Sequence, residues 1–115
     1  MTYSIFHLRT QRSATIASGQ TNSTAIDLTT TALVGFRVPA GWTGSIKLQA
    51  SLDGTNFADI YGSDGVQVGS IASPVAGAFY AVDVAALLPW PFVRFVDGTA
   101  PGSNLSIPVI TRPLA

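Results

Sequence analysis

Glycine, proline and Asp-Gly pairs interrupt this chain at intervals of roughly 8–12 residues, and apolar and polar residues alternate between the interruptions. The clearest case is 45–51, where Ile46, Leu48 and Ala50 share one face of an extended strand and polar residues share the other. A period of two closed by turn residues is typical of short strands and not of amphipathic helices. The pattern therefore restricts the chain to a fold of short antiparallel strands.

The whole pattern predicts an all-β fold: a single antiparallel β-sandwich or jelly roll of about eight strands. Asp53-Gly54 predicts the turn of a hairpin, because glycine accepts a positive φ. The segment 83–88 is the only helix candidate, with Asp83 as its cap and Pro89 limiting it to about one turn. The segments expected to be extended are 13–17, 25–28, 32–38, 45–51, 57–61, 66–71, 78–82, 91–96 and 105–110.

Charge is scarce in this sequence. Only 10% of the 115 residues are charged, against roughly 25% in an average soluble domain. All six acids are aspartate and Lys47 is the only lysine, so the residues that usually solvate helix surfaces are nearly absent. A net charge of zero gives little repulsion between molecules. We expect much of the surface to be covered by other protein chains.

The same numbers exclude several classes of partner. Six basic and six acidic residues cancel without clustering, so we expect no nucleic acid and no anionic membrane as partner. No apolar run approaches the roughly 18 residues of a membrane span, and the first ten residues lack the pattern of a secretion signal. The absence of cysteine excludes disulfides and thiolate metal sites. We therefore expect the protein either to stay inside the cell that makes it or to leave by a route that needs no signal, such as release by lysis in a virus particle.

The first dozen residues differ from the rest of the chain. We divide the sequence into an N-terminal arm or edge strand, 1–12, and a sandwich domain, 13–115. The arm is either an extra edge strand of the sandwich or a segment that docks on a neighbouring subunit, because so much exposed apolar surface is otherwise a liability. The candidate interface residues are Tyr3, Ile5, Phe6, Leu8, Arg9 and Arg12.

Catalytic chemistry has little support, and we expect no enzyme activity, no cofactor and no metal site. His7 is the only histidine, and no Gly-x-Ser-x-Gly motif accompanies it. Three of the aspartates precede a glycine, a setting in which the carboxylate usually bonds to the backbone of a turn. Ser51, Asp53, Asn56 and Asp59 offer oxygen ligands for calcium, but their spacing is not that of an EF-hand and turn formation explains them better.

Two tryptophans lie in loop-like settings and are the candidate platforms for a sugar ring. Trp42 stands in Gly-Trp-Thr-Gly and Trp90 stands between two prolines. Exposed aromatic rings serve sandwich lectins in this way. The competing interpretation, which we favour, is that each ring plugs an end of the sandwich.

One stretch resembles a known group of proteins. The run 42–61, in which an alternating strand ends in Gln-Ala-Ser and an Asp-Gly turn leads to Phe57 and then Asp-Ile-Tyr, is similar to small jelly-roll structural proteins of tailed bacteriophages. The runs 14–20 and 25–28 and the Val93-Arg94-Phe95 triplet also resemble that group, so the likeness covers roughly 13–98.

The resemblance implies a virion protein, namely a capsid decoration or cement protein on the head surface. Its partner would be the major capsid protein lattice, and it would form a homo-oligomer, a trimer being favoured. It would be made in the bacterial host cytoplasm. The alternative is a head-fibre or tail-associated module that binds host carbohydrate through Trp42 or Trp90.

Overall fold

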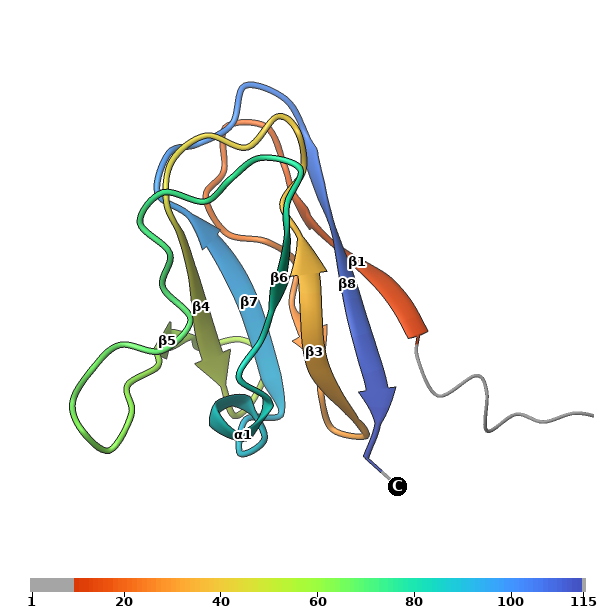
Figure 1. The fold of residues 1–115 in the computed structure, drawn as a ribbon, viewed down its shortest axis with the longest axis vertical. Helices are drawn as coiled ribbons and strands as arrows, with labels where there is room; N and C mark the ends of the chain where they lie inside the picture. Colours follow the sequence, from red (N-terminus) through yellow and green to blue (C-terminus); the bar gives the residue numbers. More distant parts are fainter. Residues whose placement is uncertain (1–9, 115) are drawn as a thin grey trace, which may run out of the picture.

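The structure, a computed structural model, describes residues 10–114 and confirms the all-β sandwich (Figure 1). One sheet, here called sheet A, has the order β1-β8-β3-β6, and sheet B has the order β2-β7-β4-β5. The strands are β1 (Thr10–Ile16), β2 (Ile26–Asp27), β3 (Thr31–Arg37), β4 (Ile46–Ser51), β5 (Ala58–Asp59), β6 (Phe79–Ala81), β7 (Phe92–Asp97) and β8 (Leu105–Pro113), and the one-turn helix is α1 (Val84–Leu87).

The strand pairing is nested. β1 pairs with β8, β2 with β7, β3 with β6 and β4 with β5, every pair antiparallel. Two further pairings, β3 with β8 and β4 with β7, join these pairs into the two sheets. Folding a chain back on itself in this way produces the eight-stranded jelly roll. The pairing of β1 with β8 also brings the two ends of the described chain into one sheet.

The core lies between the sheets and is built from the apolar side of each alternating strand. Phe95 of β7 is fully buried, and its ring meets that of Phe36 of β3 edge to face with centroids 4.9 Å apart. Tyr80 of β6 stacks on Phe36 with ring centroids 5.7 Å apart. These three rings connect the centre of sheet B to the edge of sheet A, and edge-to-face pairs of this kind stabilise by about 0.5–1.5 kcal/mol beyond their buried area.

The expected extended segment 66–71 is not a strand. It lies beside β4 through the Ile46–Ile71 bridge, and the Leu48 N–H donates to the Gly69 carbonyl. Gly69 has a φ of 76°, and a Cβ there would lie 3.0 Å from Leu48 Cβ. The left-handed backbone at this glycine interrupts the ladder, so alternation alone overestimates the regularity of the segment.

The structure also bears on the expected cap of the helix, the hairpin and the N-terminal boundary of the sandwich. Asp83 stands at the N-cap position of α1, yet its side chain makes no capping hydrogen bond. The Asp53-Gly54 hairpin exists, because β4 pairs with β5, but its return strand is only Ala58–Asp59. Within the described residues, Thr10 and Arg12 of the expected arm or edge strand 1–12 pair with Thr111 and Val109, so this part of it belongs to β1, an edge strand of sheet A.

Candidate functional site

The loop after β4 is held by a single carboxylate. Asp53 Oδ1 accepts hydrogen bonds from the Ser51 hydroxyl at 2.8 Å and from the backbone N–H groups of Thr55 and Asn56 at 2.9 Å. The Asn56 side-chain amide donates to Asp53 Oδ2 at 2.9 Å. These donors, above all the Asn56 N–H, hold the pKa of Asp53 far below its usual range. The loop is therefore rigid and its carboxylate is ionised.

Trp90 is fixed from the opposite side of the same region. Its indole N–H donates to the Ala86 carbonyl of α1 at 3.1 Å, and its ring packs against the core while remaining partly exposed. Pro89 and Pro91 restrict the backbone on both sides of it. The ring is thus positioned before any ligand arrives.

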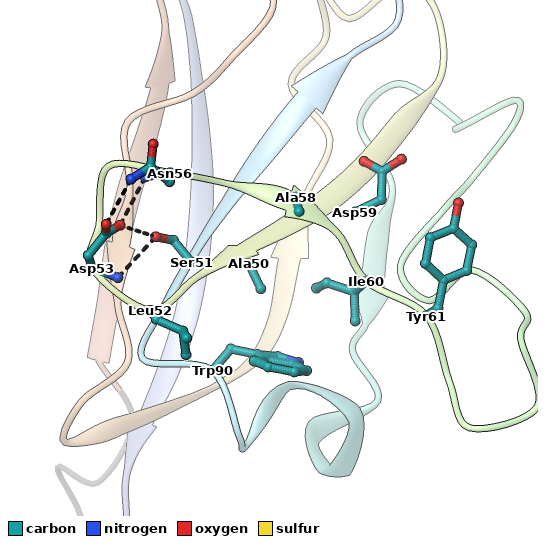
Figure 2. Close-up of a pocket in the computed structure, with 10 residues that line it drawn as sticks. All are labelled: Ala50, Ser51, Leu52, Asp53, Asn56, Ala58, Asp59, Ile60, Tyr61 and Trp90. Carbon is teal, nitrogen blue, oxygen red and sulfur yellow. Dashed lines mark hydrogen bonds between the residues drawn. The ribbon is translucent and has the colours of Figure 1, made fainter.

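Between the Asp53 loop and Trp90 lies a pocket of about 540 Å³, here called the Trp90 pocket (Figure 2). Asp53 and Asn56 lie on one side of it and Tyr61 on the other, with the Trp90 ring below Ala50 and Ile60. Leu52 is 77% exposed and Tyr61 is 59% exposed, so the rim is open to solvent. Its lining residues are Ala50, Ser51, Leu52, Asp53, Asn56, Ala58, Asp59, Ile60, Tyr61 and Trp90.

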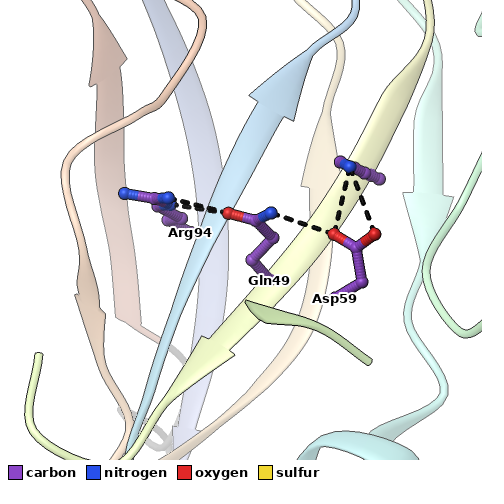
Figure 3. A network of polar contacts seen from close by, with 4 residues as sticks. Gln49, Asp59 and Arg94 are labelled. Atoms are coloured by element: carbon purple, nitrogen blue, oxygen red, sulfur yellow. Dashed lines mark hydrogen bonds and ion pairs between the residues drawn. The ribbon is translucent and has the colours of Figure 1, made fainter. Parts of the chain in front are cut away.

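A polar network crosses the outer face of sheet B (Figure 3). Two guanidinium nitrogens of Arg94 donate to Gln49 Oε1 at 2.8 and 3.0 Å, and the Gln49 amide donates to Asp59 Oδ1 at 2.9 Å. Lys47 completes the network with an ion pair to Asp59 at 3.0 Å. The Gln49 amide and then Lys47 lower the pKa of Asp59, and burial lowers the pKa of Arg94. The outer polar groups of β4, β5 and β7 are thus largely satisfied by one another.

The outer face of sheet A has a different character. Residues that alternate with the buried side chains of β1, β8, β3 and β6 point outward there, as Ser13 does opposite Pro108 and Gly35 opposite both Ile110 and Ala81. The strands of sheet A contain no carboxylate at all, and Phe79 on this face is 74% exposed. The outer-face residues are Ser13, Thr15, Ala32, Val34, Gly35, Arg37, Phe79, Ala81, Ser106, Pro108, Ile110 and Arg112.

The two candidate tryptophans have different environments. Trp42 lies in the loop between β3 and β4, at the top of Figure 1, and is only 7% exposed. It is a plug and not a platform, which removes it from the candidate sugar-binding residues. Trp90 follows α1, which lies at the opposite end of the sandwich in Figure 1. Its ring lines the Trp90 pocket.

A carboxylate, that of Asp97, is also buried. Asp97, the last residue of β7, is 1% exposed, and its Oδ1 accepts the Thr99 N–H at 3.0 Å. Asp97 Oδ2 and Trp42 Nε1 are buried without a hydrogen-bond partner in the described part of the chain. Burial raises the pKa of Asp97, although the Thr99 N–H opposes the shift.

Most of the expected arm interface lies outside the described residues: Tyr3, Ile5, Phe6, Leu8 and Arg9, together with His7. Arg12 is described, and its guanidinium Nη2 donates to the Asp27 carbonyl at 3.0 Å and to Thr31 Oγ1 at 3.2 Å. It therefore ties β1 to β2 and β3 within the chain and is only partly available to a partner.

Sequence reasoning did not find Leu52 and Tyr61 as pocket residues, because their meeting with Trp90 depends on nonlocal pairing. Among residues 10–114, no group of three or more histidine, aspartate or glutamate side chains is arranged to hold a metal ion. No helix in that range is long and apolar enough to cross a membrane. No family model, no curated protein and no solved structure matches the chain.

Proposed function

We propose that this chain is a virion structural protein, a capsid decoration or cement protein that binds the major capsid protein lattice and stabilises the head. The observation that carries the proposal is the outer face of sheet A: four strands with no carboxylate, small or apolar outward residues and exposed Phe79. The likeness of 42–61 to phage jelly-roll proteins supplies the kind of assembly.

The chemistry of this face suits burial against protein. Interface centres are depleted in charged residues and enriched in aromatic residues and arginine. Phe79 and Arg37 lie together here, with the guanidinium carbon 5.2 Å from the ring centroid. Two arginines, Arg37 and Arg112, lie on this face, and the strands of sheet A contain no acid, so the face carries a charge of +2. A neutral or acidic patch of capsid surface would complement this face.

The segment 1–9 is joined directly to β1, an edge strand of the same sheet. Its apolar residues and the outer face of sheet A would then form one continuous contact with the shell or with a neighbouring copy. The proposal includes a homo-oligomer, with a trimer favoured, on the capsid surface after synthesis in the bacterial cytoplasm. The low overall charge supports extensive coverage by other chains.

Cosedimentation with expanded capsids tests the docking face. Phe79→Asp places a carboxylate on sheet A, whereas Val66→Asp makes a similar change at a residue that is 63% exposed and lies outside both sheets. We expect Phe79→Asp to weaken binding by at least about tenfold, equivalent to about 1.4 kcal/mol, and Val66→Asp to bind normally. Equal binding by both variants would contradict the assignment of the face.

Deletion of residues 1–9 tests the arm separately and leaves β1 intact, because β1 begins at Thr10. The deleted protein should remain folded by circular dichroism and lose most of its binding to capsids. Binding at wild-type strength would remove the arm from the interface without affecting the assignment of sheet A.

A second candidate function is carbohydrate binding on the host surface. The specific observation that favours it is the Trp90 pocket, where a positioned and partly exposed indole meets Tyr61 and amide and carboxylate oxygens. Aromatic rings bordered by such oxygens are the usual elements of sugar sites. A glycan array would test it, and an array without hits would leave the structural function alone.

A further inference from the structure

We infer that the Trp90 pocket binds a neutral, polyhydroxylated ligand, a saccharide without carboxylate, sulfate or phosphate groups. The inference rests on the second candidate function, whose binding site and ligand class it specifies. It does not depend on capsid binding, because the pocket borders β4 and β5 of sheet B, whereas the docking face belongs to sheet A.

The size and floor of the pocket fit part of an oligosaccharide. Its volume of about 540 Å³ lies within the range of roughly 300–1,000 Å³ typical of small-molecule sites. The Trp90 ring and the side chains of Leu52 and Ile60 supply an apolar surface on which the C–H face of a sugar ring can lie. Because the Trp90 indole is bonded to Ala86, little side-chain freedom would be lost on binding.

The polar atoms that remain free at the rim are mainly acceptors. Asn56 Oδ1 and the Tyr61 hydroxyl have no hydrogen-bond partner among residues 10–114. Asp53 Oδ2 accepts one bond, from Asn56, although a carboxylate oxygen can accept two. Asp59 Oδ2 accepts one long bond of 3.3 Å, from Lys47. A ligand that satisfies these acceptors must bring donors, and the Tyr61 O–H and the second Asn56 N–H need acceptors; sugar hydroxyl groups supply both.

The charge of the lining selects against acidic ligands. Asp53 and Asp59 line the pocket and no cationic side chain does. Lys47 pairs with Asp59, whereas Asp53 has no ionic partner in the described chain. The hydrogen bonds that lower the pKa of Asp53 keep it ionised throughout the neutral range. An anionic sugar would bring like charge to Asp53 without a compensating cation.

The test is a glycan array containing neutral, amino and acidic glycans, followed by titration of the full chain with neutral hexose oligosaccharides by NMR. We expect hits among neutral glycans and none among sialylated, uronic or sulfated ones. Hits confined to acidic glycans or to amino sugars would overturn the inference while leaving carbohydrate binding standing. An array without hits would overturn both.

Variants locate the site. Tyr61→Ala changes a side chain that is 59% exposed, and Phe79→Ala is its matched control on sheet A at 74% exposure. Tyr61→Ala should weaken binding of the neutral ligand by about tenfold, and Phe79→Ala should leave that binding unchanged.

Trp90→Ala should abolish binding of the ligand. Its folding is checked separately, because the Trp90 ring also packs on the core. Equal affinities for the Tyr61 and Phe79 variants would place the ligand elsewhere. If the wild-type protein binds no sugar and Tyr61→Ala loses capsid binding, the pocket is a contact with another protein and the inference is wrong.

Discussion

Sheet A and sheet B each have four strands and share one core, yet their outer faces differ in composition. The outer face of sheet A carries Arg37 and Arg112 and no acid, a charge of +2, because Arg12 shares the face of buried Ala14. On the outer face of sheet B, Asp27 and Asp59 balance Lys47 and Arg94, and Asp97 is buried. On sheet B the outward polar groups bond to one another across three strands (Figure 3).

The outer faces of the two sheets therefore satisfy their exposed side chains in different ways. Sheet B completes its own polar contacts and opens a pocket at one edge. The outer face of sheet A carries small and apolar residues, of which Phe79 is exposed and Val34 and Ile110 are half-buried, an arrangement that a protein partner can stabilise by further burial. Stability should therefore depend on the core and on sheet B, and docking should depend on sheet A.

The largest expected effect on stability separates the core from the proposed docking face on sheet A. Phe95→Ala removes a fully buried ring that touches Phe36 and should cost about 3–5 kcal/mol of unfolding free energy. Phe79→Ala, on the outer face of sheet A, should change the free energy by no more than about 0.5 kcal/mol. Urea denaturation measures both. A cost above about 2 kcal/mol for Phe79→Ala would mean that sheet A's face is a structural element of the monomer.

The next largest expected effect on stability compares one arginine on each sheet, Arg94 on sheet B and Arg37 on sheet A. Arg94→Ala removes two hydrogen bonds to Gln49 and the stacking on Phe57, whose ring centroid lies 4.3 Å from the guanidinium carbon. Because the group is half-buried, we expect a loss of about 1–2 kcal/mol. Arg37→Ala on sheet A removes an exposed contact and should cost about 0.5 kcal/mol. Thermal unfolding compares the two, and equal losses would contradict the contrast between the sheets.

The smallest effect concerns pH, and it belongs to sheet B because the strands of sheet A contain no acid. The raised pKa of Asp97 in the folded protein contributes stability that is fully present below the unfolded value of about 3.9 and is lost as pH rises through the folded value. Asp97→Asn should therefore stabilise the protein at neutral pH, by roughly 1 kcal/mol, with the gain vanishing below about pH 4.

Asp59 is a control, because its contribution to stability should change with pH in the opposite direction to that of Asp97. Its lowered pKa contributes stability that is present above the unfolded value and is lost as pH falls through the folded value. Asp59→Asn should destabilise the protein at neutral pH and lose that effect in acid. Parallel pH profiles for the two variants, measured by chemical denaturation, would show that burial does not distinguish the two carboxylates.

Several features were predictable from the sequence because they are local. The alternation in 45–51, the Asp-Gly turn and Pro89 after α1 predicted the strand, the turn and the one-turn helix. The Asp53 hydrogen bonds follow from the short spacing of Ser51, Asp53 and Asn56.

Other features depend on contacts between distant residues. The irregular backbone at Gly69 follows from its packing against Leu48. The burial of Trp42 and the partial exposure of Trp90 depend on which loops close each end of the sandwich, although both tryptophans stand in similar loop-like sequences. The outer face of sheet A, which lacks carboxylates, forms only when β1 pairs with β8 and β3 pairs with β6. A pattern with a period of two gives a strand its two faces but does not say which strands share a sheet.

The most direct test of the proposed docking role is hydroxyl-radical footprinting of the free protein compared with the protein mixed with the capsids that we propose it binds. Phe79 on sheet A and Tyr61 at the Trp90 pocket are both exposed aromatic side chains in the described chain, at 74% and 59%. We predict that Phe79 becomes strongly protected on the capsids while Tyr61 is labelled as in the free protein. Labelling of Phe79 at its free rate, or protection of Tyr61 in its place, would contradict the assignment of sheet A as the docking face.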